Sequence, residues 1–207
     1  INTYHIIMSS ARKVLAFARA SYPCEADSNE ELSFLRGDVL DIYEIGNDGW
    51  WTATLGKHAG LVPQQYLKPV QNVDALLHFI RLYYSNVKNI FAEKNINQQF
   101  LQQAQQLMAG GMKHSALVQC LYKCNPYALA QVVKDQLKGQ QTSLIPAELY
   151  NTIVSMDTSL GGSGYNKQII APLNNLLKSK ISNLQYLTLS ALFRTLGSLT
   201  NININLL

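Results

Sequence analysis

The sequence lacks any long hydrophobic run, and its apolar stretches are far shorter than the roughly 20 residues that a membrane-spanning helix needs. Its first ten residues, INTYHIIMSS, contain neither a basic segment nor a long apolar segment. They therefore do not have the pattern of a secretory signal. These absences predict a cytoplasmic protein with no transmembrane segment.

Cysteine is also scarce. The chain has three cysteines, Cys24, Cys120 and Cys124, and an odd number without a secretion signal favours free thiols in a reducing compartment. Cys120 and Cys124 are four residues apart, which would place them on one face of a helix, but only His114 is nearby as a further ligand. We predict no metal site and no cofactor.

The pattern of a catalytic centre is missing as well. No Ser-His-Asp order, His-Cys pair or pair of carboxylates stands out. The acids of the second half are scattered along the chain: Asp74, Glu93, Asp135, Glu148 and Asp157. The chain is therefore not expected to be an enzyme.

Charge is distributed unevenly between the two halves. Residues 11–70 carry six Lys/Arg and eight Asp/Glu, whereas residues 71–207 carry eleven Lys/Arg and five Asp/Glu. The basic residues do not form a run and no aromatic residues alternate with them, so we expect no nucleic-acid partner. An acidic protein surface is the better partner for the second half, with a simply solvated helical exterior as the alternative.

The hydrophobic pattern changes its period after Pro69. Short runs at 14–18, 39–43 and 50–55, separated by Gly- and Asp-rich turns, predict the strands of a small all-β barrel. Beyond it, apolar residues follow helical spacing at Val73, Leu76, Leu77, Ile80, Tyr83, Tyr84 and Val87. Further helices are predicted at 96–109, 115–123, 126–138, 146–155, 166–178 and 183–199, with a loop at 157–164. The predicted domains are 11–70 and 72–207.

Several separated motifs of the first domain resemble the SH3 family. They are ASYPCEADSNEELSF at 20–34, Gly37-Asp38, Gly49-Trp50-Trp51 and GLVPQQY at 60–66. The Tyr-Pro-Cys-Glu-Ala segment is similar to SH3 domains of the GRAF and oligophrenin-like RhoGAP proteins. The resemblance implies a groove for proline-rich peptides, formed by Tyr22, Trp50, Pro63 and Tyr66.

The same resemblance implies that Asp27, Glu30 and Glu31 form an acidic wall that pairs with a basic residue of the ligand. Cys24 stands where many SH3 domains have a second groove tyrosine. None of the six prolines of the chain is spaced as P-x-x-P. The proline-rich partner is therefore expected to be another protein, or a segment absent from this sequence.

The second domain resembles the RhoGAP family most closely at 130–150, AQVVKDQLKGQQTSLIPAELY. The expected fold class of the whole chain is therefore a small all-β SH3 barrel followed by an all-α RhoGAP-like helical bundle. The resemblance implies a Rho/Rac-family small GTPase as partner. The matching positions for GTPase binding are Asn89, Lys134, Lys138, Pro146 and one of Asn201, Asn203 or Asn205.

Ala92 stands at the position where the family has its catalytic arginine finger, which raises the rate of GTP hydrolysis by a factor of about 10³ to 10⁵. Three interpretations remain. We favour a domain that binds the GTPase with weak or absent activation. The domain could instead be an unconventional activator, in which Lys94 or another cation, such as Lys134 or Lys138, reaches the phosphate, or an adaptor with no GTPase partner. Recruitment to the membrane or actin cortex would then occur through partners.

Overall fold

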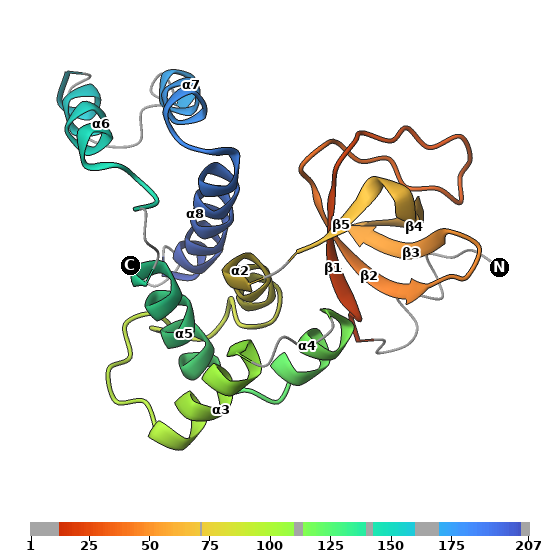
Figure 1. Cartoon of the computed structure of the whole chain (residues 1–207), viewed down its shortest axis with the longest axis horizontal. Helices are drawn as coiled ribbons and strands as arrows, with labels where there is room; N and C mark the ends of the chain where they lie inside the picture. The colour runs from red at the N-terminus through yellow and green to blue at the C-terminus, as the bar shows by residue number, and fades with distance from the viewer. Residues whose placement is uncertain (1–12, 71, 110–113, 140–142, 160–169, 204–207) are drawn as a thin grey trace.

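The computed structural model describes residues 13–70, 72–109, 114–139, 143–159 and 170–203. A small β barrel forms the first part of the chain, and a mostly helical region follows it (Figure 1). This arrangement of an all-β domain followed by helices is the one that the change of hydrophobic period predicts.

The barrel is a five-stranded antiparallel sheet with the order β4-β3-β2-β1-β5. Its strands are β1 (Ala16–Ala20), β2 (Val39–Ile45), β3 (Trp50–Leu55), β4 (His58–Pro63) and β5 (Leu67–Pro69), with the 3-10 helix η1 (Gln64–Tyr66) before β5. The predicted bounds of β3 are confirmed. The first strand begins two residues later than predicted, and the sequence pattern predicted no separate strands at β4 and β5.

Strand β1 is buried on both of its faces. Ala16, Ala18 and Ala20 pack in the barrel core with Leu40. Phe17 points the other way, because successive side chains of a strand alternate, and it packs in a second cluster with residues of the helical region. The apolar run at 14–18 is explained by this burial on two sides.

The helices are α2 (Asn72–Tyr83), α3 (Gln98–Ala109), α4 (His114–Leu121), α5 (Pro126–Lys138), α6 (Ala147–Ser159), α7 (Ile170–Lys180) and α8 (Asn183–Asn203). The bounds of α5 match the prediction because Asn125 caps it, its side chain accepting hydrogen bonds from the backbone N–H of Tyr127 and Ala128, and because Pro126 fits the first helical turn.

The helices pack in two hydrophobic clusters. The larger one includes Phe17 and Val70 of the barrel together with residues of α2 to α5. The smaller one joins α6, α7 and α8 through Leu149, Leu177 and Leu189. Helix α2 packs against both α5 and α8 and so links the two groups (Figure 1).

Several predicted helix ends are wrong. Helix α2 ends at Tyr83 and not at Val87, because Ser85 and Asn86 compete for backbone hydrogen bonds and favour turns. Helix α6 continues to Ser159, so the first three residues of the predicted 157–164 loop are helical, and its remainder lies outside the described residues. Helix α8 passes Leu199 and reaches Asn203, since no proline or glycine follows Leu199 to stop it.

Candidate functional site

The predicted groove aromatics follow one another along the barrel surface. Trp50 pairs with Pro63 across β3 and β4, and Pro63 caps η1, which ends at Tyr66. The Tyr66 ring lies 5.9 Å from the Tyr22 ring in an edge-on arrangement. Tyr22 is 61% exposed, Trp50 and Tyr66 are half-buried and Pro63 is buried, so the four predicted residues lie in one row whose aromatic rings are partly accessible.

A cavity of about 540 Å³ lies beside Trp50 and Pro63 and also includes Gln64 and Gln65 of η1 in its lining. Flat rings next to a hollow suit a polyproline II helix, whose proline rings form ridges that pack on aromatic surfaces. Trp51 packs against the barrel cluster and contributes to the core of the barrel.

The acidic segment is held beside β4 by a glycine. Glu31 forms a parallel bridge with Leu61, and the Leu61 N–H donates to the Glu30 carbonyl at 2.8 Å. A Cβ on Gly60 would lie 2.8 Å from the backbone carbon of Glu31, so this close approach requires glycine. The acids are thereby placed two residues along β4 from Pro63.

The three predicted acids are not equivalent. The carboxylate of Glu31 accepts hydrogen bonds from the Asp27 N–H and the Ser28 hydroxyl, so it stabilises its own loop. Asp27 and Glu30 are exposed, and their carboxylates have no hydrogen-bond or ion-pair partner among the described residues. These two acids are the ones available to a basic ligand residue.

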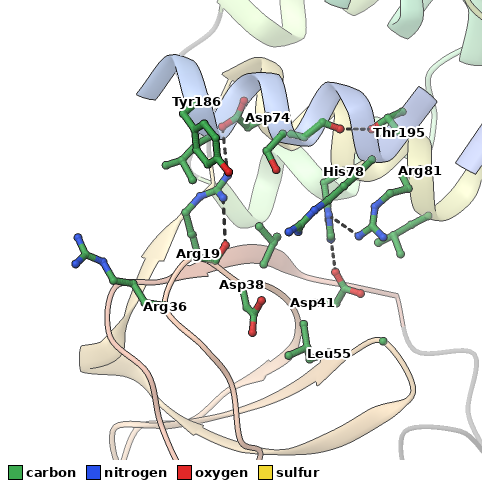
Figure 2. Close-up of a pocket in the computed structure, with 18 residues that line it drawn as sticks. Arg19, Arg36, Asp38, Asp41, Leu55, Asp74, His78, Arg81, Tyr186 and Thr195 are labelled. Atoms are coloured by element: carbon green, nitrogen blue, oxygen red, sulfur yellow. Dashed lines mark hydrogen bonds and ion pairs between the residues drawn. The ribbon is translucent and has the colours of Figure 1, made fainter. Parts of the chain in front are cut away.

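The barrel contacts the helical region through the outward face of β1 and β2. Phe17 packs edge-on against His78 of α2, with ring centroids 4.6 Å apart. His78 Nε2 lies 2.7 Å from a carboxylate oxygen of Asp41, and Arg81 donates to His78 Nδ1 at 3.0 Å (Figure 2). Because a guanidinium only donates, Nδ1 is the acceptor in the contact with Arg81, and Nε2 is then the nitrogen that donates to Asp41.

A second polar contact crosses the same interface. Arg19 of β1 donates to the Asp74 carboxylate and to the Gly37 carbonyl, each at 3.3 Å (Figure 2). Burial raises the pKa of the Asp74 carboxyl, and the Arg19 charge opposes this rise. Sequence analysis missed these residues, although polar Asp74 and His78 within the apolar pattern of α2 were a usable signal.

Some of the residues predicted to bind a GTPase also lie close together in the structure. The Lys134 ammonium group donates to the Phe91 carbonyl at 3.2 Å, next to Ala92. Asn89 has a φ of +54°, a conformation that glycine adopts readily and asparagine tolerates. Its carbonyl accepts the Ala92 N–H at 2.8 Å and closes a tight turn. Ala92 is exposed on this turn, and Lys94 is exposed two residues after it.

The other predicted GTPase-binding residues lie on different elements. Lys138 is exposed in the last turn of α5. Pro146 precedes α6, which packs with α7 and α8 in the smaller cluster. Asn201 and Asn203 fall within the bounds of α8 and not in a stretch beyond it, and Asn205 lies outside the described residues.

The cysteines form no metal site in the part of the chain that the structure describes, where no group of three candidate ligands gathers. The prediction that Cys120 and Cys124 share one helical face is wrong, since α4 ends at Leu121. The Cys124 thiol donates to the Cys120 carbonyl, and burial raises its pKa to about 11. Across the same described ranges, none of the helices has the length and hydropathy to span a bilayer.

The row of partly exposed aromatics on a five-stranded antiparallel barrel, with acids beside it, is typical of a peptide-binding module of the SH3 type. The family model described as "Variant SH3 domain" matches residues 17–70. This segment of the chain is an SH3 domain, as the sequence motifs predicted.

Known proteins resemble part of the chain. The myosin ID heavy chain of Dictyostelium discoideum is 39% identical over 62 residues, 30% of this chain and 6% of that protein. Human Rho GTPase-activating protein 10 is 46% identical over 52 residues, 25% of this chain and 7% of that protein. The chain thus spans only a small fraction of either relative's length.

Two solved structures are also similar to part of the chain. The C-terminal SH3 domain of myosin IB from Entamoeba histolytica, solved with an EhFP10(GEF) peptide, is 39% identical and matches 27% of this chain and 93% of that one, with a TM-score of 0.26. SH3 domain 1 of human Rho GTPase-activating protein 10 is also 39% identical, matching 28% and 86% of the two chains, with a TM-score of 0.26.

Proposed function

We propose that this protein recruits another protein by binding its proline-rich segment in the groove of Tyr22, Trp50, Pro63 and Tyr66. The observation that carries the proposal is that these residues form one row with partly accessible aromatic rings, while the helical region packs on the outward face of β1 and β2. The helices therefore leave the groove open to a ligand.

The chemistry of the row suits this ligand. A polyproline II helix is already extended before it binds, so it loses little conformational entropy on the aromatic surface. Asp27 and Glu30 would pair with an arginine or lysine at one end of the peptide and so fix its orientation. The expected complex forms in the cytoplasm, where partners recruit the protein to the membrane or actin cortex.

Replacing Trp50 with alanine is expected to weaken binding of a peptide with a P-x-x-P core and a terminal arginine by roughly 30-fold, because a buried interface tryptophan commonly contributes 2 kcal/mol or more. Isothermal titration calorimetry on the full chain measures the effect. Tyr150→Ala, at an exposed aromatic residue of α6, is the matched control. Equal affinity of the Trp50→Ala variant and the parent chain would contradict the proposal.

A second candidate function concerns the helical region, which we propose binds a Rho/Rac-family small GTPase with weak or absent activation of hydrolysis. It is supported by the resemblance of residues 130–150 to the RhoGAP family and by the contact between Lys134 and the Phe91 carbonyl. That contact joins two segments that the resemblance assigns to one GTPase-facing surface, and the region's excess of basic residues suits an anionic partner.

Activation is expected to be weak because Ala92 offers no charge to the transferring phosphoryl group. An arginine finger stabilises the charge that develops there with a planar fork that a lysine does not reproduce. The exposed Lys94 could supply a positive charge from a position two residues after Ala92, as the unconventional activator requires. Its single ammonium group would still make a poor activator.

Single-turnover GTP hydrolysis by a panel of Rho and Rac proteins, with a pull-down of each nucleotide state, tests this candidate. We expect capture of a GTP-loaded protein with hydrolysis near its intrinsic rate. Acceleration by several orders of magnitude would favour the unconventional activator, and Lys94→Ala and Lys134→Ala would then locate the substitute cation. Capture of no Rho-family protein in any nucleotide state would leave the adaptor as the remaining interpretation.

A further inference from the structure

A second cavity, of about 500 Å³, lies where the SH3 domain meets the start of α8. One wall comes from the barrel and includes Tyr22, Arg36 and Lys68, and the other comes from Asn183, Tyr186 and Leu187 of α8. Tyr22 is also the last aromatic residue of the groove row, so the cavity lies at the Tyr22 end of that row.

The cavity is basic. Its lining contains Arg19, Arg36 and Lys68 and no acidic residue. Arg19 is occupied by Asp74 and the Gly37 carbonyl. Arg36 and Lys68 are exposed and have no ion-pair partner in the described part of the chain, so two positive charges remain available at this end of the groove.

The α8 wall is fixed in place by its first turn. The Gln185 N–H donates to the Ser182 hydroxyl, and the Gln185 side chain accepts from the Ser182 N–H, which forms a reciprocal cap. Tyr186 and Leu187 are half-buried on the next turn, and Asn183 is exposed at the rim. Figure 2 draws the neighbouring cavity, which shares Arg19, Arg36 and Tyr186 with this one, and shows Tyr186 of α8 beside Arg19, with Arg36 on the barrel side.

The contacts fix the order of features along the groove. The acids at 27–30 lie beside β4, next come Trp50 and Pro63, then Tyr66 and Tyr22, and finally the basic cavity. The two ends of the groove therefore carry opposite charge. A ligand with a basic residue at one end of its proline core and carboxylates at the other would match both ends.

We propose that this cavity is a subsite for an acidic flank of the proline-rich ligand, so that Arg36, Lys68 and the start of α8 extend peptide recognition from the SH3 domain into the helical region. The inference rests on the proposed peptide binding. The flank is the segment on the far side of the proline core from the ligand's arginine, and it carries aspartate or glutamate.

Three fluorescent peptides test the subsite on the full chain by anisotropy. They share one arginine and one proline core and differ only in the far flank, which is Asp-Glu-Asp, Asn-Gln-Asn or Lys-Arg-Lys. We expect the acidic flank to bind roughly 3- to 10-fold more tightly than the neutral one, as two partly exposed ion pairs would provide. The preference should shrink at high salt, because exposed charges are screened.

Variants assign the effect to named residues. The double variant R36E and K68E is expected to abolish or reverse the order of the acidic and basic flanks, whereas K123E, at an exposed lysine outside the cavity lining, should leave it unchanged. Asn183→Asp adds a negative charge to the α8 wall at an exposed position and should weaken only the acidic-flank peptide. This last variant tests whether the helical region takes part.

The neutral-flank peptide separates the two proposals. Failure of all three peptides to bind would overturn the proposed peptide binding itself. Binding of the neutral-flank peptide with equal affinities for all flanks would overturn only the subsite. A flank preference that Asn183→Asp does not change would confine the subsite to Arg36 and Lys68 and contradict the part assigned to α8.

Discussion

Replacing Phe17 with alanine is expected to lower the free energy of unfolding by about 3 to 5 kcal/mol, the range for removing a buried phenylalanine. Phe17 is fully buried, and its ring contacts His78 and Phe79 of α2 although it belongs to a strand of the SH3 domain. The loss should therefore reach both halves of the chain. Urea unfolding followed by tryptophan fluorescence and circular dichroism measures it.

Hydrogen exchange gives the discriminating readout for this variant. Phe17→Ala should increase exchange in β1 and also in α2 and α5, since all three contribute to the same cluster. Leu40→Ala removes an equally buried side chain from the barrel cluster and should affect chiefly the strands. Faster exchange confined to the strands in both variants would show that the two halves are not coupled through Phe17.

Introducing arginine at Ala92 is expected to raise GTP hydrolysis in a captured Rho-family complex by about 10³-fold, the lower end of what an arginine finger contributes. Ala92 is exposed, so the new side chain needs no repacking of a core. The turn that presents it is held by the Asn89 carbonyl and by the Lys134 contact to Phe91. Single-turnover hydrolysis with the captured GTPase is the measurement.

Two control substitutions at the same position separate the effects of side-chain length and of charge from that of the planar guanidinium group. Ala92→Gln supplies length without charge and should leave the rate unchanged, and Ala92→Lys supplies charge without the planar fork and should raise it only slightly. An Ala92→Arg variant that still captures the GTPase without faster hydrolysis would show that this turn does not face the γ-phosphate.

Much of the barrel could be predicted from short-range patterns. Trp50 and Trp51 alternate across β3, so one faces the groove and the other the core. Helix α5 was predicted to the residue because Asn125 and Pro126 are strong local start signals. The ends of α2, α6 and α8 were predicted less well, because the local stop signals there are weaker: Ser85 and Asn86 follow α2, and no proline or glycine follows Leu199 in α8.

The groove was predictable for the same reason, whereas its surroundings were not. Tyr22, Trp50, Pro63 and Tyr66 belong to motifs that a single sequence displays. The basic cavity needs Arg36 and Asn183, which are far apart in the chain and meet only because α8 packs on α2, which in turn packs on β1. The RhoGAP resemblance of the helical region and its GTPase partner stay predictions.

The sequence by itself determined the SH3 domain, the helical character of the second half, the groove residues and the absence of arginine at position 92, because each depends on residue type and local spacing. The tertiary structure alone decided that Phe17 and α2 share one core, that Lys134 meets Phe91 and that a cavity lined by basic residues lies beside Tyr22. These features depend on contacts between residues distant in sequence, and local periodicity carries no information about which buried faces will meet.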